Sequence, residues 1–312
     1  MTVGAVDCGT NSIRLLIAEP GEDGRLRDVH REMRIVRLGQ GVDATGEFAP
    51  EALARTESAL SDYVDLMREH GVRTVRMVAT SAARDAGNRD EFFAMTARLL
   101  GSVSPGAVAE VITGTEEAEL SFRGAVGELD TDAAPFVVVD LGGGSTELVL
   151  GASEVTASFS ADIGCVRIKE RCLHSDPPTA AEIGAARAVV RERLAEALAV
   201  VPVEGARTWV GVAGTFTTLA ALAHRLPAYD PAAIHLSRTA FSDLLPVCEQ
   251  LLAMTGEQRL ALGPMHEGRA DVIPGGAIIV QELTRVLAER AGLSELVVSE
   301  HDILDGIALS IA

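Results

Sequence analysis

The sequence predicts an α/β protein of two domains with an internal duplication. Its 312 residues are enough for two domains of roughly 150 residues each. Residues 3–18 (VGAVDCGTNSIRLLIA) and 136–151 (FVVVDLGGGSTELVLG) repeat one pattern: an apolar run, Asp-x-Gly, small polar residues and a second apolar run. Strand-like and helix-like segments follow each copy, which is typical of α/β architecture.

The first half contains strand, turn and helix signals in a clear order. The first repeat predicts two strands, GEDGR (21–25) predicts a hairpin turn, and the residues after it predict a further strand. Pro50 opens an amphipathic helix that Gly71 closes. A strand then runs into a polar turn at Thr80–Ser81. Beyond it we expect a helix over 90–100, a short strand over 109–115 and a helix from about Glu116.

The second half follows the same logic. After the second repeat, the pattern predicts a strand over 155–164 and a helix over 179–200. RTWVGVAGTFTTLAALAHRL (207–226) predicts a buried strand, a Gly-Thr turn and a helix. Residues 274–292 predict a late helix, and the chain ends with a strand and a terminal helix that we expect to be capped near Ser299.

These elements divide the chain into two domains. We expect the first domain at 1–125, completed by the C-terminal helix at 300–312, and the second at 126–299. The terminal helix has an apolar stripe that includes Ile303 and Ile307, with no partner downstream of it. We therefore expect this helix to pack back on the first domain.

The composition disfavours several classes of function. The formal net charge is −18, whereas nucleic-acid binders normally carry basic surfaces that hold phosphate. Lys169 is the only lysine, so a phosphate site must use arginine guanidinium groups. No apolar stretch approaches ~18 residues, and the first residues lack the basic and apolar regions of a signal peptide. We expect a cytoplasmic protein that binds neither nucleic acid nor membrane.

The four cysteines show no pattern of disulfide or metal pairing, which agrees with a cytoplasmic protein. None of them forms a Cys-x-x-Cys pair. Because disulfides are rare in the cytosol, we interpret all four as reduced thiols.

The repeated strand–turn–strand motif has a use in phosphate chemistry. Glycine lets backbone N–H groups approach an anion closely, and Ser and Thr add hydroxyl donors. An Asp at the end of the first strand can hold Mg²⁺, which keeps several waters and takes few carboxylates. Two such hairpins facing each other across an interdomain cleft would clamp a phosphate chain and its metal ion from both sides.

These motifs resemble those of the actin-like, sugar-kinase and Hsp70 superfold, which carries two such phosphate loops. Within it, the chain is similar to the exopolyphosphatase/guanosine pentaphosphate phosphohydrolase (Ppx/GppA) family, in its short two-domain form. The segments that carry the resemblance are AVDCGTNSIRLLIA, VATSAAR, ITGTEEAELSF, VVDLGGGSTELVL, ADIGCVR and GVAGTFTTLAAL. The resemblance runs from residue 3 to about 310 and implies two actin-like (ribonuclease H-like) domains with an interdomain cleft.

The resemblance also implies roles for individual residues. Glu117 in ITGTEEAELSF matches the catalytic base that deprotonates the attacking water. Asp140 and Glu147 match catalytic carboxylates around the metal ion and the water, and Asp7, their counterpart in the first repeat, is a third expected metal ligand. The implied metal is Mg²⁺, with Mn²⁺ as the alternative. The phosphate-binding turns match Asn11, Ser12 and Arg14; Thr80, Ser81 and Arg84; Gly142, Gly143, Gly144 and Ser145; and Gly214 and Thr215.

Several of these side chains also have purely structural interpretations. Glu117 could be an ordinary acidic residue in the first turn of a helix, where the dipole favours it. Arg84 could serve in a salt bridge, Thr215 could cap a helix, and Arg14 could point away from the cleft. Arg269 is equally an interdomain strut or a ligand contact.

Two further groups raise the question of metal ligation. His301-Asp302 is the dipeptide of a metal phosphohydrolase domain, but such a domain needs further ligands over a long helical region. We therefore interpret this pair as chance. Cys165 and Cys172 have only His174 nearby, and we expect no metal site there.

The leading functional hypothesis is a hydrolase that releases terminal phosphate from inorganic polyphosphate, with short chains preferred. Its nearest rival is a guanosine pentaphosphate 5′-phosphohydrolase, because the same catalytic residues serve both reactions. A small-molecule kinase would need a nucleotide pocket and an acceptor site. An alarmone-binding regulator with weak turnover is a further alternative. By resemblance, a homodimer is also plausible.

Overall fold

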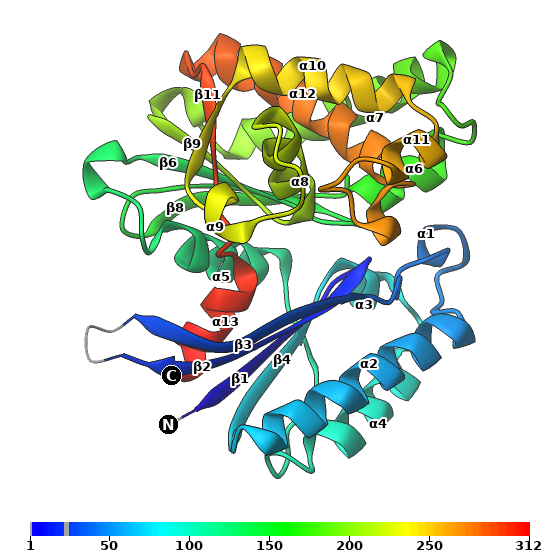
Figure 1. Cartoon of the computed structure of the whole chain (residues 1–312), viewed down its shortest axis with the longest axis vertical. Coiled ribbons are helices and arrows are strands. Elements are labelled where there is room, and N and C mark those ends of the chain that lie inside the picture. The colour runs from blue at the N-terminus through cyan, green and yellow to red at the C-terminus, as the bar shows by residue number, and fades with distance from the viewer. Residues whose placement is uncertain (1, 22–24) are drawn as a thin grey trace. The chain divides into compact units, whose positions relative to one another are not determined.

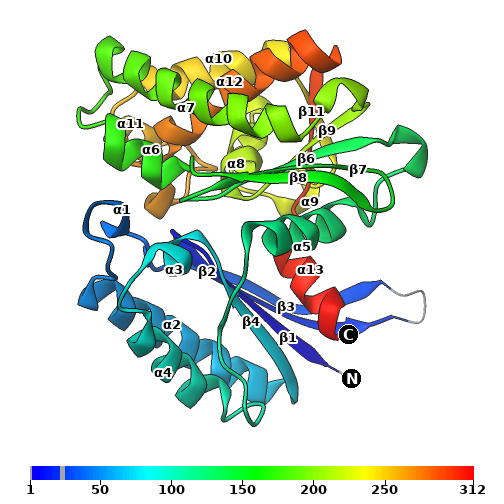
Figure 2. The same ribbon diagram turned by 180° about the vertical axis from the view of Figure 1, so that it is seen from behind.

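The computed structural model describes residues 2–21 and 25–312, so residues 22–24 of the predicted hairpin turn lie outside the described residues. The chain divides into two compact units. The first unit contains Met1–Gly124 and Ile303–Ala312, and the second contains Ala125–Asp302. Figure 1, and the reverse view in Figure 2, show a β-sheet with helices packed against it in each unit.

The sheet of the first unit has five strands in the order β3-β2-β1-β4-β5. They are β1 (Val3–Cys8), β2 (Ser12–Pro20), β3 (Leu26–Ile35), β4 (Thr74–Ala79) and β5 (Glu110–Val111). The first three strands form an antiparallel meander, whereas β4 runs parallel to β1 and β5 runs parallel to β4. Every residue of β1 is buried, because helices cover both faces of the sheet at its centre.

Helices pack on both faces of this sheet. They are α1 (Val42–Thr45), α2 (Pro50–Glu69), α3 (Ser81–Asp85), α4 (Arg89–Leu100), α5 (Gly114–Val126) and α13 (Ile303–Ile311). One face forms a core with α2 and α4, in which Leu60 and Phe92 are fully buried. The other face forms a core with α13 and α5, in which Ile307 packs with Leu16 and Leu120.

Helix α13 is fixed to the first unit by polar and close contacts as well as by its apolar face. Arg31 Nη2 lies 2.5 Å from Oδ1 of the buried Asp305. A Cβ at Gly306 would overlap the backbone carbonyl of Leu120, so only glycine allows α13 to lie this close to α5. The C-terminal helix therefore belongs to the core of the first unit.

The sheet of the second unit has six strands in the order β10-β11-β9-β6-β7-β8. They are β6 (Phe136–Leu141), β7 (Thr146–Gly151), β8 (Val155–Ala161), β9 (Thr208–Val212), β10 (Ser237–Ala240) and β11 (Glu295–Val298). Strands β6, β7 and β8 form an antiparallel meander, and β9 and β11 extend it in parallel, as in the first unit. The duplication therefore extends from the repeated motif to five strands of each sheet, while β10 is added antiparallel to β11 in the second unit only. The predicted α/β class is confirmed.

The helices of the second unit enclose one large core around Trp209 and Phe216. They are α6 (Cys165–Cys172), α7 (Ala180–Val200), α8 (Gly214–Ala223), α9 (Pro231–Ile234), α10 (Phe241–Ala253), α11 (Gly256–Leu260) and α12 (Ile273–Ala291), with 3₁₀ turns η1 (Thr131–Ala133), η2 (Val203–Gly205) and η3 (Glu267–Arg269). A capping box of Thr179 and Glu182 begins α7. None of the helices in the described part of the chain has the length and apolar character to cross a membrane.

The structure differs from the sequence expectations at the terminal helix and in several segments, among them α1, α3 and α6, where no element is predicted. The terminal helix begins at Ile303 and is not capped by Ser299, whose hydroxyl instead bonds the backbone N–H and carbonyl of His301. No element is predicted over 227–272, where the structure forms α9, β10, α10 and α11. Pro246 lies inside α10 and interrupts the helical signal, since proline lacks the backbone donor that a helix interior uses.

Candidate active site

Two buried carboxylates lie side by side on the second repeat. Asp140 near the end of β6 is the direct cross-strand partner of Glu147 on β7, so both side chains lie on one face of the sheet. Their exposed fractions are 6% and 1%. The hydroxyl of Ser160 on β8 donates to Glu147 Oε1 at 2.7 Å. The hairpin therefore fixes both carboxylates on rigid strands.

The turn between these strands is Gly142–Ser145, and helix α6 holds it in place. The N–H of Gly142 donates to the carbonyl of Ser145 at 3.1 Å, which closes the turn. The Gly142 carbonyl accepts from Cys165 N–H, and the Gly143 carbonyl accepts from the next two N–H groups of α6. A Cβ at Gly164 would overlap Gly143, so this glycine lets the helix reach the turn. The segment ADIGCVR therefore supports the glycine-rich turn.

Helix α8 begins at the same edge of the second sheet. Asp140 pairs in register with Val212, the last residue of β9, and α8 begins at Gly214. The intervening Ala213 has φ 72° and ψ 174°, a backbone conformation that is essentially reserved for glycine. A Cβ at Gly214 would overlap the guanidinium of Arg269. Backbone strain and a close arginine therefore coincide at this turn.

Arg269 belongs to the second unit and is anchored there. Its Nη1 donates to Oγ1 of Thr218, which lies near the start of α8, at 2.7 Å. The side chain therefore places a positive charge over the Gly214 turn. Thr215 is buried and contributes to the packing of Gly276 on α12.

The first repeat builds the corresponding hairpin with a different pair. Asp7 on β1 is the cross-strand partner of Arg14 on β2, the same pair of positions as Asp140 and Glu147. Arg14 Nε and Nη2 both donate to Asp7 Oδ2, at 2.9 and 2.7 Å. Arg14 therefore lies on the same face as Asp7 and pairs with it.

The turn of the first repeat is supported in the same way as the turn of the second. Gly9 N–H donates to the Ser12 carbonyl at 2.9 Å, as Gly142 does to Ser145. The Asn11 carbonyl accepts from two N–H groups that follow β3, and the Thr10 carbonyl accepts from Gly39 N–H at 2.9 Å. A Cβ at Gly39 would overlap the Thr10 side chain. In both repeats, backbone N–H groups of the segment after the third strand donate to carbonyl groups of the turn and so hold the turn in place.

Glu117 and Arg84 form an ion pair at the edge where the parallel strands of the first sheet end. Glu117 lies in the first turn of α5, with its side chain 9% exposed. Arg84 Nη1 is 2.6 Å from Glu117 Oε2 and also donates to the Ile112 carbonyl at 3.1 Å. Thr80 and Ser81 are buried beside them, and Thr80 N–H donates to the Cys8 carbonyl. Arg84 therefore holds the orientation of the Glu117 carboxylate.

The neighbouring Glu116 has a different environment. Its side chain is 42% exposed and pairs with Arg76 on β4 at 2.6 Å. Thr113 Oγ1 accepts from Glu116 N–H and so caps α5. Of the two adjacent glutamates, Glu117 is the one buried among the predicted site residues.

The carboxylates of the second unit suit a magnesium ion. Mg²⁺ is usually bound by one or two carboxylates together with waters and substrate phosphate oxygens. Asp140 and Glu147 offer two carboxylates from adjacent strands. Asp7 differs from them, because a metal ion there would compete with the Arg14 guanidinium.

The supporting roles of the residues that hold the turns have no local signal in the sequence. Ser160, Gly164 and Gly39 act through strand register and close packing, which are properties of the tertiary structure. Ala213 has no sequence signal, because alanine is not a residue expected at positive φ. Among the described residues, the first unit supplies a turn, the Asp7–Arg14 ion pair and the Glu117–Arg84 ion pair. The second unit supplies a glycine-rich turn and the carboxylate pair Asp140 and Glu147.

Comparison with known proteins agrees with this arrangement. Residues 16–311 match the Ppx/GppA phosphatase family. The chain belongs to this family. Among curated relatives, Exopolyphosphatase 2 of Mycobacterium tuberculosis is 70% identical over 313 residues, covering 99% of this chain and 98% of that protein. The predicted family is therefore confirmed, and membership in a phosphatase family confirms the predicted hydrolase class.

Solved structures of Ppx/GppA proteins have the same fold. An exopolyphosphatase-like protein superposes with a TM-score of 0.92 at 43% identity, covering 99% of this chain and 98% of that one. A PPX-GPPA enzyme from Aquifex aeolicus has a TM-score of 0.79 at 31% identity and covers 99% of both chains. Members of the Ppx/GppA family generally depend on a divalent metal ion.

Proposed function

We propose that this chain is a metal-dependent exopolyphosphatase that releases terminal orthophosphate from inorganic polyphosphate. The observation that carries the proposal is the pair of buried carboxylates, Asp140 and Glu147, beside a glycine-rich turn. The 70% identical relative is named Exopolyphosphatase 2, which supports a phosphoanhydride substrate.

Glu117 acts as the general base in this proposal. It accepts a proton from the water that attacks the terminal phosphorus, and the leaving polyphosphate chain departs with the electron pair of the broken P–O bond. A positioned base of this kind is worth ~10²–10⁴-fold in rate. Arg84 is its positioning residue, because the 2.6 Å contact fixes one carboxylate oxygen.

Asp140 and Glu147 hold the metal ion in this proposal. When bound, Mg²⁺ neutralises charge on the phosphoryl oxygens, and Mn²⁺ can replace it. The Gly142–Ser145 and Gly9–Ser12 turns and the Thr80–Ser81 segment offer donors to phosphate oxygens. Arg14, Gly214 and Thr215 complete the predicted phosphate contacts.

We propose that short chains are preferred. A long polyanion is best held by an extended basic track. This chain has a net charge of −18 and one lysine, which does not favour such a track. We also propose that the enzyme acts in the cytoplasm, because its four cysteines are free thiols. From the family resemblance alone, we propose that it forms a homodimer.

The test measures phosphate release from short polyphosphate, long polyphosphate and guanosine pentaphosphate in parallel. Each substrate is tested with Mg²⁺, with Mn²⁺ and with a chelator. Glu117→Gln removes the base with little change in shape, and we expect a fall in kcat of at least 100-fold. Glu116→Gln is the matched control, since Glu116 is the exposed neighbour, and we expect nearly wild-type activity.

Other results would overturn the proposal in different ways. Faster release from guanosine pentaphosphate than from any polyphosphate would identify a 5′-phosphohydrolase. Saturable alarmone binding without phosphate release would identify a regulator. Equal activity of Glu117→Gln and wild type would remove Glu117 from the mechanism.

A further inference from the structure

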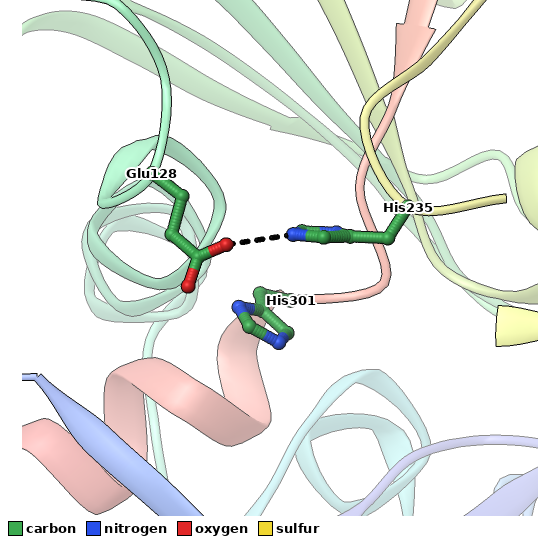
Figure 3. A group of neighbouring side chains, drawn as sticks. All are labelled: Glu128, His235 and His301. Carbon is green, nitrogen blue, oxygen red and sulfur yellow. Dashed lines mark hydrogen bonds and ion pairs between the residues drawn. The ribbon is translucent and has the colours of Figure 1, made fainter. Parts of the chain in front are cut away.

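Two histidines and a glutamate come together in the second unit, apart from the residues used in the proposed reaction. Glu128 follows the end of α5, His235 directly follows α9, and His301 lies two residues before α13. One ligand atom from each side chain lies within 4.8 Å of the other two. Figure 3 shows the three side chains pointing toward one another from these three segments.

We propose that Glu128, His235 and His301 bind one divalent transition-metal cation, with Zn²⁺ as the best fit. Two imidazoles and one carboxylate are a three-ligand set that zinc accepts, with a fourth position left for water. Mg²⁺ prefers an all-oxygen octahedral site, so this cluster would not select the metal proposed for the reaction.

The geometry is close to what such a site needs. Glu128 Oε2 and His235 Nε2 are already 2.9 Å apart. The rings of His235 and His301 are tilted by 35° with centroids 4.5 Å apart. In a tetrahedral site with ~2.1 Å bonds, ligand atoms are roughly 3.4 Å apart. The Glu128 and His235 atoms must therefore move slightly apart, and any pair near the 4.8 Å limit must approach by about 1 Å, which side-chain rotation can supply.

The backbone around the two histidines is held firmly. The Ser299 hydroxyl accepts from His301 N–H at 3.0 Å and donates to the His301 carbonyl at 2.8 Å. Leu236, the residue after His235, has φ 56°, which is a rare conformation for a leucine. Its N–H donates to the Val298 carbonyl at 2.7 Å. This strained link fixes His235 next to the segment that carries His301, and backbone strain of this kind clusters at functional sites.

Exposure favours entry of an ion. Glu128 is exposed, and both histidines are partly exposed, so a hydrated cation can reach all three ligands from solvent. A cluster with one carboxylate and two imidazoles also lacks the mutual repulsion that three carboxylates would have in the absence of metal.

The position of the protons sets the expected affinity. Glu300 N–H donates to His235 Nδ1 at 3.2 Å, so in the metal-free state Nε2 carries the proton and donates it to Glu128. When a cation binds Nε2, that proton must leave Nε2 and Nδ1 must become protonated. The Glu300 N–H then turns away from the ring. Because this rearrangement costs His235 its hydrogen bonds with Glu300 and with Glu128, we expect binding weaker than in preformed structural zinc sites.

The site would stabilise the second unit where the chain enters and leaves it. Glu128 lies just after Ala125, where the unit begins, and His301 lies just before Asp302, where it ends. A cation shared by both segments and by His235 links three parts of the chain that are far apart in sequence. A ligand at free concentration c that binds only the folded state stabilises it by RT ln(1 + c/Kd), so the melting temperature rises with the concentration of free cation.

The test uses the full chain after treatment with a chelator, without any phosphate compound. Zn²⁺ binding is measured by calorimetry, and Co²⁺ is added as a spectroscopic probe of tetrahedral ligands. We expect one equivalent of Zn²⁺ and a higher melting temperature with it. In His301→Gln and Glu128→Gln, we expect affinity at least tenfold lower. Melting curves of these variants without metal verify that they fold.

Two control variants separate this site from other ligands. His174→Gln and Cys172→Ser remove the exposed histidine and the partly exposed thiol at the end of α6, and we expect unchanged binding in both. Glu117→Gln should also bind zinc normally, so failure of the proposed function and failure of this site are distinguishable. The proposal is overturned if wild type binds no zinc, or if His301→Gln binds it as tightly as wild type does.

Discussion

Glu147 on β7 is the cross-strand partner of Asp140. In the first repeat, Arg14 on β2 holds the equivalent position as the partner of Asp7. In the first hairpin, the carboxylate and the guanidinium are bonded to each other at 2.7 Å. In the second, two carboxylates are adjacent and buried, an arrangement in which like charges repel and a divalent cation relieves the repulsion. The duplicated scaffold has thus diverged into one ion pair and one set of candidate metal ligands.

The first prediction follows from this difference. Glu147→Gln removes one of the two adjacent charges and keeps the side-chain shape, so we expect at least tenfold more Mg²⁺ to be needed for half-maximal phosphate release. Titration of activity with Mg²⁺ measures this directly. Ser160→Ala removes only the 2.7 Å hydrogen bond to Glu147, and we expect a smaller shift in the same direction. An unchanged Mg²⁺ requirement in Glu147→Gln would exclude Glu147 as a metal ligand.

The second prediction concerns the strained turn before α8. A residue in this conformation stores about 1–3 kcal/mol, while glycine loses roughly 0.5–1 kcal/mol through its flexibility. We therefore expect Ala213→Gly to raise the free energy of unfolding by about 0 to 2.5 kcal/mol in denaturant titrations. Ala220→Gly, inside the same helix, should lower it by about 1 kcal/mol or more. A destabilised Ala213→Gly variant would mean that the strain is not relieved by glycine.

Much of the fold could be predicted because its signals are local. The repeated Asp-x-Gly motifs, Pro50 at a helix start and the glycines of the turns each act through a few neighbouring residues. Glu117, Asp140 and Glu147 followed from the same motifs by resemblance to a known family. Their roles in the reaction stay predictions.

The rest depends on contacts between distant segments. No local pattern shows that Arg84 pairs with Glu117 while Arg76 pairs with Glu116, because strand register decides which arginine reaches which glutamate. In the same way, His301 could be noticed only with its neighbour Asp302. Its spatial neighbours are Glu128 and His235, which the chain brings to it from far away in sequence.

The third prediction concerns a buried acid in α12 of the second unit. Burial raises the pKa of Glu282, but hydrogen bonds from Arg191 and Arg285 outweigh it and hold this pKa below the ordinary value of 4.5. A lowered pKa gives stability that is complete above pH 4.5 and is lost as the pH falls through the native pKa. We expect Glu282→Gln to lower the free energy of unfolding by about 1–2 kcal/mol at pH 7, and by less at pH 4.

Denaturant titrations at the two pH values measure this difference. Glu289→Gln is the control, because Glu289 is exposed and pairs with the same Arg285. Its effect should be within about 0.5 kcal/mol at both pH values. A Glu282→Gln effect that grows as the pH falls would contradict the assignment.

The fourth prediction concerns the thiols. Burial raises the pKa of Cys165 to about 11 and that of Cys248 to about 12, and burial next to Asp7 raises the pKa of Cys8 as well. Cys172 is partly exposed, although burial also raises its pKa. Because the thiolate is the reactive form, we expect a thiol reagent at pH 8 to label one cysteine of four in the native protein, more slowly than free cysteine.

Mass spectrometry of the labelled protein identifies the site, and Cys172→Ser should abolish the labelling. All four thiols should react in denaturant, since unfolding exposes the three buried ones and returns their pKa values to normal. Labelling of Cys165 in the native state would contradict this prediction and would point to local opening at the start of α6. Cys165 N–H holds the Gly142 carbonyl, so a reactive Cys165 would show that the start of α6 opens and releases the glycine-rich turn.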